Sequence, residues 1–203
     1  MVYLITNRSL CEEHKYLEIV KKSIECGIDG IILREKDLDD KSLYSIGKKI
    51  KGYMHGSNCK LIVNINSNFM VAKELNAYGI QLSYSTFKYS MKSIPKSIEA
   101  VGVSIHSIEE AINAEKLGAS YLLCSNVYET ECKMGLQGKG TEFIKDLKCA
   151  VNIPIVALGG INLENVQDVW NAKADGVAVM SLIMKTKDKS QIKNIIDKLK
   201  NTR

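Results

Sequence analysis

Two stretches near the end of the chain decide the fold: 153–161 (IPIVALGGI) and 174–181 (ADGVAVMS). Each is a short apolar run, rich in β-branched residues, that ends in small or polar residues. Strands that are buried on both faces have continuous apolar sequences of this kind, as in parallel sheets covered by helices. The two stretches therefore predict parallel strands at 153–157 and 175–179.

The same pattern recurs toward the N-terminus. We expect six further strands, at 2–6, 29–33, 60–64, 79–82, 100–104 and 120–124. Helical periodicity fills most of the gaps, at 12–25, 40–53, 67–76, 107–117, 163–172 and 188–200. Eight strands alternating with helices predict an α/β fold, a single (β/α)₈ TIM barrel over residues 1–203. The alternative is a doubly wound open sheet, but no G-x-G-x-x-G motif follows the first strand.

Composition restricts the partners of this chain. The formal net charge is +5, which suits an anionic ligand such as a phosphate. The basic residues are spread along the chain, which argues against nucleic-acid binding. No apolar run is long enough to cross a bilayer, and the six cysteines form no C-x-x-C pair. With no secretory signal at the start, we expect a cytoplasmic protein with free thiols.

The loops after the last two strands predict a phosphate pocket. Gly159 and Gly160 follow the seventh strand, and Met180 and Ser181 follow the eighth. Paired glycines let backbone N–H groups approach an anion, and these loops are the usual phosphate site of a barrel. The alternatives are a tight turn at the glycines and a helix cap at Ser181.

Two polar segments are predicted at the same end of the barrel. Residues 34–36 (REK) follow the second strand and would attract an anion through Arg34 and Lys36. The alternative there is an Arg–Glu ion pair that holds the rim together. Residues 126–140 follow the sixth strand as a long polar loop, in which Thr130 and Lys133 could contact a phosphate or pyrophosphate. The alternative is a solvated loop without a binding role.

Five ordered motifs resemble one known family over nearly the whole chain. Residues 32–36 (ILREK) resemble the "QLREK" segment of thiamine phosphate synthases, and 101–107 (VGVSIHS) resemble their "GVSTHS" segment. Residues 127–135 (VYETECKMG) resemble their "VF-x-T-x-x-K-x-G" loop, and the two stretches quoted first resemble their last strands. The chain thus resembles the thiamine phosphate synthase/TenI family.

This resemblance implies a (β/α)₈ barrel in thiamine metabolism. Synthase members join a hydroxymethylpyrimidine diphosphate to a thiazole phosphate and release pyrophosphate, with Mg²⁺ holding the leaving group. By matching motif, the residues implied to contact the diphosphate or pyrimidine are Arg34, Lys36, Asn64, Ser104, Thr130 and Lys133. Those implied to hold the thiazole phosphate are Gly159, Gly160, Met180 and Ser181.

The chain departs from the synthase pattern at the metal ligands. Synthases carry aspartates in "N-D-R" after strand three and "G-Q-x-D" after strand four. Here the two segments read 64–66 (NIN) and 82–86 (LSYST), without a carboxylate. Mg²⁺ prefers charged oxygen ligands. We therefore expect no metal ligands in the protein and no cofactor, with Mg²⁺ needed only if the synthase reaction holds.

The TenI branch is the closer resemblance. Its loop reads "VFETDCKKG", and its members are associated with aromatising a thiazole tautomer phosphate by proton transfer. The base in that branch is a His directly before the loop, where this chain has Asn126. His106, just past the fifth strand, could supply the acid/base function, or it could have a structural role at the rim.

Three functions follow from these patterns. The first is a TenI-like thiazole tautomerase with His106 and Asn126 as the candidate catalytic residues. The second is a thiamine phosphate synthase, which also binds the pyrimidine diphosphate. The third is a non-catalytic protein that binds or senses thiazole phosphate. A homodimer is ordinary for a barrel of this size.

Overall fold

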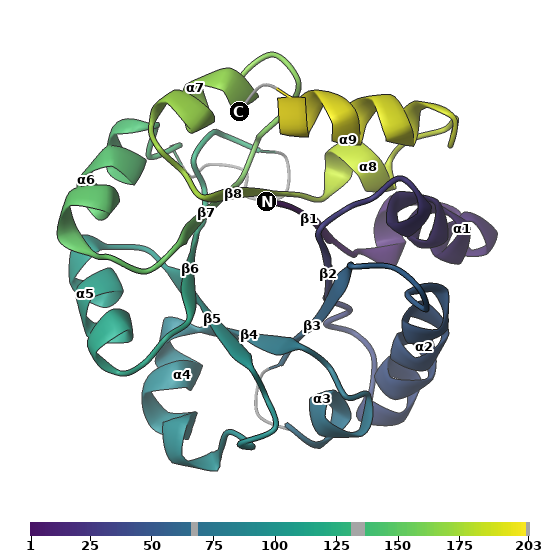
Figure 1. Cartoon of the computed structure of the whole chain (residues 1–203), viewed down its shortest axis with the longest axis horizontal. Coiled ribbons are helices and arrows are strands. Elements are labelled where there is room, and N and C mark those ends of the chain that lie inside the picture. The colour runs from purple at the N-terminus through teal and green to yellow at the C-terminus, as the bar shows by residue number, and fades with distance from the viewer. Residues whose placement is uncertain (66–68, 131–136, 202–203) are drawn as a thin grey trace.

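A computed structural model describes residues 1–65, 69–130 and 137–201, and it forms a closed barrel of eight parallel strands (Figure 1). The strands are β1 (Val2–Ile5), β2 (Gly30–Leu33), β3 (Lys60–Asn64), β4 (Gly79–Ser83), β5 (Ala100–Ile105), β6 (Tyr121–Cys124), β7 (Ile155–Leu158) and β8 (Gly176–Val179). They pair in chain order, and β8 pairs with β1 to close the ring. The (β/α)₈ prediction is confirmed, and every predicted strand coincides with an observed one within two residues at either end.

The helices form an outer ring around the strands (Figure 1). Within the described residues they are η1 (Arg8–Leu10), α1 (Glu13–Glu25), α2 (Asp40–Tyr53), α3 (Met70–Glu74), α4 (Tyr84–Ser90), η2 (Met91–Ser93), α5 (Ile108–Lys116), α6 (Glu142–Ala150), α7 (Val166–Asn171), α8 (Ser181–Met184) and α9 (Gln191–Asn201). The helices between consecutive strands lead the chain back to the start of the next strand, whereas α8 and α9 follow the last strand. The barrel's N-terminal mouth therefore carries the returning loops, and the opposite mouth carries the strand ends.

Helices α4 and α6 were not predicted from the sequence. Helix α4 is short and buries one side chain, Phe87, whereas α6 is amphipathic and buries Ile144 and Leu147, so its pattern was present in the sequence and was missed. Helix α4 begins because the Ser83 hydroxyl accepts a hydrogen bond from the Thr86 N–H at 3.1 Å. Packing on the barrel then supplies the stability that the pattern alone does not show.

The barrel interior is a packed apolar core with an aromatic layer. Its buried members are Tyr3, Ile5, Ile32, Ile62, Tyr121, Leu123, Val156 and Ala178. The rings of Tyr3 and Tyr121 are parallel within 5°, with centroids 6.4 Å apart. Glycines on the neighbouring strands make room for them, because a Cβ on Gly30 or Gly102 would overlap the Tyr3 or Tyr121 ring.

A larger apolar layer lies between the strands and the helices. Successive strand residues face opposite sides, so Leu4 packs outward where Tyr3 and Ile5 face inward. This double burial explains the continuous apolar strand sequences. In the part of the chain that the structure describes, no helix combines the length and apolar character needed to span a bilayer.

Candidate active site

A cavity of about 490 Å³ opens at the mouth formed by the C-terminal strand ends. Of the predicted site residues, it is lined by Arg34, Lys36, Asn64, Ser104, His106, Asn126, Thr130, Gly159, Gly160, Met180 and Ser181. Parallel strands bring these residues together, because all eight C-terminal ends meet at one mouth. Lys133 lies outside the described residues.

The paired glycines have left-handed backbones and lie directly against the loop that follows β6. Gly159 has φ +108° and Gly160 has φ +64°. A Cβ on Gly159 would lie 2.8 Å from the Asn126 Cα, and one on Gly160 would lie 2.6 Å from the Glu129 carbonyl oxygen. The Tyr128 N–H donates to the Gly159 carbonyl at 3.0 Å. The glycines thus allow the close approach of two loops and also leave backbone exposed to the cavity.

Helix α8 follows β8 and lines the same part of the predicted phosphate pocket, and we call the backbone N–H groups of Gly159, Gly160, Ser181 and Leu182 the amide corner. The helix begins at Ser181, and the Met184 N–H donates to the Met180 carbonyl at 2.9 Å. The first N–H groups of a helix have no intrahelical acceptor. Those of Ser181 and Leu182 belong to residues that line the cavity, beside Gly160. Residues of both loops therefore line the cavity where we predict that backbone amides bind a phosphate.

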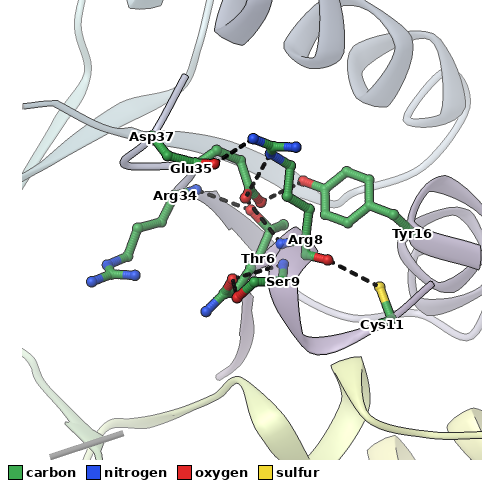
Figure 2. Close-up of polar contacts among 9 residues, drawn as sticks. Thr6, Arg8, Ser9, Cys11, Tyr16, Arg34, Glu35 and Asp37 are labelled. Atoms are coloured by element: carbon green, nitrogen blue, oxygen red, sulfur yellow. Dashed lines mark hydrogen bonds and ion pairs between the residues drawn. The ribbon is translucent and has the colours of Figure 1, made fainter. Parts of the chain in front are cut away.

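The cationic rim after β2 is supported by a buried carboxylate. Glu35, whose side chain is 1% exposed, accepts hydrogen bonds from the Tyr16 hydroxyl at 2.8 Å and the Arg8 N–H at 3.0 Å. Its charged partner is Arg8, with Nε at 4.0 Å, and Arg8 also pairs with Asp37. Figure 2 shows the Arg34 side chain extending away from this cluster. The interpretation of an Arg34–Glu35 pair is therefore wrong.

This arrangement separates the charges around Arg34. The Glu35 carboxylate is occupied inside the protein by the Tyr16 hydroxyl and the Arg8 backbone N–H, and it points away from the Arg34 side chain at the rim (Figure 2). The Arg34 N–H donates to the Thr6 hydroxyl at 3.0 Å, which ties the end of β2 to the end of β1. Burial and the neighbouring carboxylate raise the pKa of Tyr16, which keeps its hydroxyl a donor.

His106 is held by its backbone at the end of β5. Its N–H donates to the Glu110 carboxylate at 2.6 Å, and its carbonyl accepts from the Lys139 ammonium at 2.5 Å. The Glu110 N–H in turn donates to the Ser107 hydroxyl at 3.1 Å, which caps the start of α5. The imidazole Nδ1 lies 3.4 Å from the Ser125 hydroxyl, and both side chains line the cavity.

Asn126 has a backbone conformation that few residues adopt easily. Its φ of +66° lies in the left-handed region, where asparagine and histidine are enriched among non-glycine residues. Its amide nitrogen donates to the Gln137 carbonyl at 2.9 Å. An asparagine here both turns the chain and braces the loop that follows β6.

Sequence reasoning missed four polar residues of the cavity wall: Gln81, Ser83, Ser125 and Asn162. Gln81 could have been found, because it is a polar residue in the middle of an apolar strand. The other three are common loop residues at strand ends, where sequence alone does not separate wall residues from solvated ones.

Comparison with known proteins agrees with this geometry. A family profile described as thiamine monophosphate synthase matches residues 2–183. The chain belongs to this family. A thiamine-phosphate synthase of Pyrococcus horikoshii is 36% identical over 187 residues, which are 92% of this chain and 88% of that protein.

Two further relatives cover essentially the whole chain. The thiamine-phosphate synthase of Clostridium acetobutylicum is 33% identical over 206 residues, covering 100% of this chain and 97% of its own. The solved thiamine phosphate pyrophosphorylase of Pyrococcus furiosus superposes with a TM-score of 0.82 at 28% identity, covering 99% of this chain and 96% of that one. The family's fold and motif order therefore extend over the length of this chain.

The donors in the cavity do not fit a Mg²⁺ ion held by the protein. The described residues at the ends of β3 and β4 include Asn64, Ile65, Ser83 and Tyr84, and the described cavity lining contains no Asp or Glu. Residues 1–65, 69–130 and 137–201 also hold no group of three His, Cys, Asp or Glu side chains suited to a metal. Neutral amides and hydroxyls are weak substitutes for the carboxylates that Mg²⁺ prefers.

Proposed function

We propose that this protein binds a thiazole phosphate and transfers a proton on its ring, as a TenI-like thiazole tautomerase. The observation that carries the proposal is a family cavity with an amide-lined corner, a cationic rim and a histidine, but without a carboxylate among its described residues. Such a cavity suits an anionic ligand and a proton transfer that involves no protein-bound metal.

The phosphate end of the proposed ligand would lie at the corner of Gly160 and Ser181. Backbone amides bind a phosphate without contributing a net charge, and the side-chain cations are placed elsewhere on the rim. The ring would then extend toward β4, β5 and β6, where the polar side chains of the wall lie. This orientation separates the anchoring of the ligand from its chemistry.

His106 is the proposed proton carrier. Imidazole is the side chain whose ordinary pKa suits proton transfer near neutrality. Its ring lies beside the Ser125 hydroxyl, and its backbone is held on both sides by Glu110 and Lys139. Asn126 occupies the place of the histidine base of TenI proteins, and we propose that its amide orients the ring.

The test follows conversion of the thiazole tautomer phosphate by NMR with purified protein. We expect conversion faster than in buffer, and a loss of at least about tenfold in His106→Ala. His55→Ala is the matched control, because His55 is exposed just after the C-terminal end of α2 and is not among the residues that line the cavity. Asn126→His should raise the rate, since histidine tolerates this backbone. No acceleration by the unmodified protein refutes the proposal.

A second candidate, thiamine phosphate synthase, is favoured by the names of the relatives at 33–36% identity. It would need Arg34 and Lys36 to hold the diphosphate, with any Mg²⁺ carried largely by the diphosphate itself. Incubation with both substrates and Mg²⁺ tests it, and formation of thiamine phosphate above background would replace the tautomerase proposal. Thermal stabilisation by thiazole phosphate without turnover of either kind would instead support a binding or regulatory protein.

A further inference from the structure

A chain of side-chain hydrogen bonds crosses three neighbouring strands and ends at the cavity. The Tyr121 hydroxyl on β6 donates to the Gln81 Oε1 on β4 at 2.8 Å. The Gln81 Nε2 then donates to the Ser104 Oγ on β5 at 3.0 Å. Gln81 is only 1% exposed, yet it and Ser104 both line the cavity, whereas Tyr121 is buried beneath them.

The neighbours of the Gln81 amide determine its orientation. Its nitrogen lies 3.4 Å from the Leu82 carbonyl oxygen, which can only accept a hydrogen bond. A flipped amide would place two acceptor oxygens against each other there. The nitrogen therefore faces Leu82 and Ser104, and the oxygen faces Tyr121. Burial raises the pKa of Tyr121, so its hydroxyl remains the donor to that oxygen.

The backbone is built to permit this contact. Gln81, Gly102 and Tyr121 are direct partners in the register of β4, β5 and β6. A Cβ on Gly102 would overlap both the Tyr121 ring and the Gln81 Oε1. The central strand therefore carries a glycine where the two side chains meet. Ser104 lies two residues further along β5, on the same inward face.

From this geometry we propose that Tyr121 and Gln81 are positioning residues that hold the Ser104 hydroxyl as a hydrogen-bond donor to the ring of the ligand. Because Ser104 accepts from Gln81, its own hydrogen is directed elsewhere, and its side chain faces the cavity. The site thus selects a ring that presents an acceptor atom, such as an unprotonated ring nitrogen, toward β5. This inference takes the ligand class, a thiazole phosphate, from the proposed function.

The test is a double-mutant cycle read by calorimetric titration with two probes, thiazole phosphate and inorganic phosphate. The proteins are the unmodified chain, Ser104→Ala, Tyr121→Phe and the double variant. One lost neutral hydrogen bond corresponds to a loss of about two- to tenfold in thiazole phosphate affinity, expected for Ser104→Ala. We expect Tyr121→Phe to weaken binding about two- to fivefold, and to add nothing in the Ser104→Ala background.

Two controls separate positioning from general damage. Inorganic phosphate should bind all four proteins within about twofold, because Gly160 and Ser181 follow β7 and β8, whereas this chain of bonds lies on β4, β5 and β6. Ser104→Thr should keep the affinity for thiazole phosphate, because threonine retains the hydroxyl. If the thermal transition shows that Tyr121→Phe does not fold, Gln81→Met replaces it in the cycle with the same expected non-additivity.

Three results overturn the inference: additive losses in the double variant, an equal loss for inorganic phosphate, or no preference of the unmodified protein for thiazole phosphate. These titrations require no turnover. Absence of tautomer conversion would therefore remove the proposed reaction, while the role of Tyr121 and Gln81 would still be decided by the cycle.

Discussion

Replacing Glu35 by alanine should be among the most destabilising single changes at the rim. The side chain is 1% exposed and accepts two hydrogen bonds, from the Tyr16 hydroxyl and the Arg8 N–H (Figure 2). Alanine removes the acceptor and leaves both donors beside an apolar methyl group. The cost arises from these donors, because a buried polar group without a partner has lost its hydration and gained nothing.

The magnitude follows from the number and kind of groups affected. Each buried donor that loses its acceptor costs about 1–3 kcal/mol, so two would cost about 2–6 kcal/mol. The bond from the Tyr16 hydroxyl is buried but that from the Arg8 N–H is only partly buried, so we expect about 3 kcal/mol, in the lower half of that range. The guanidinium of Arg8 adds little, because its side chain is 38% exposed and also contacts Asp37. In a protein of this size, a loss of 1 kcal/mol in the free energy of unfolding lowers the melting temperature by about 2–4 °C. We therefore expect the melting temperature of Glu35→Ala to decrease by about 6–12 °C.

The assay is urea unfolding followed by the fluorescence of Trp170, with a thermal scan in parallel. Glu35→Gln should lose only about 1 kcal/mol, because its amide oxygen can accept from one donor and its nitrogen can donate to the Tyr16 oxygen. Glu25→Ala is the matched control. Glu25 is 50% exposed in pairs with Lys21 and Lys22, and its loss should cost less than about 0.5 kcal/mol.

The reasoning is refuted if Glu35→Ala loses less than about 1 kcal/mol, or no more than Glu25→Ala. Equal losses in the alanine and glutamine variants of Glu35 would also contradict it, because the expected difference between them rests on hydrogen bonding.

Three other predictions concern the rim and the glycines. Gly160→Ala should weaken thiazole phosphate binding at least about tenfold by titration, since a left-handed alanine is strained and its Cβ would lie 2.6 Å from the Glu129 carbonyl; unchanged affinity would contradict this. Arg34→Gln should weaken the same ligand about five- to tenfold and flatten the dependence of affinity on salt, and an unchanged salt dependence argues against a cationic rim. In helix α2, Gly47→Ala should lower the melting temperature, because its Cβ would overlap the buried Leu75 side chain. Gly52→Ala should instead raise the free energy of unfolding by up to about 1 kcal/mol, because its Cβ would meet no other atom. Equal changes in melting temperature for the two variants would contradict this prediction.

Much of the site could be predicted because its residues follow strands. Arg34 and Gly159 each lie directly after an apolar run, and a closed parallel barrel carries all such positions to one mouth. Asn64 and Ser104, which also line the cavity, were expected only from the family resemblance. The pairing of Glu35 with Arg8 could not be predicted, because 27 residues separate them and only the pairing of β1 with β2 brings them together.

The sequence alone was sufficient to predict the barrel, the end of the barrel at which we expect ligands to bind, and the family resemblance. These depend on local periodicity and on the order of strands, which a sequence states directly. Which side chains meet across the barrel was a matter of strand register and of volume. Gln81 reaches Tyr121 only because Gly102 lies between them without a side chain, and this three-strand coincidence exists only after the sheet has closed.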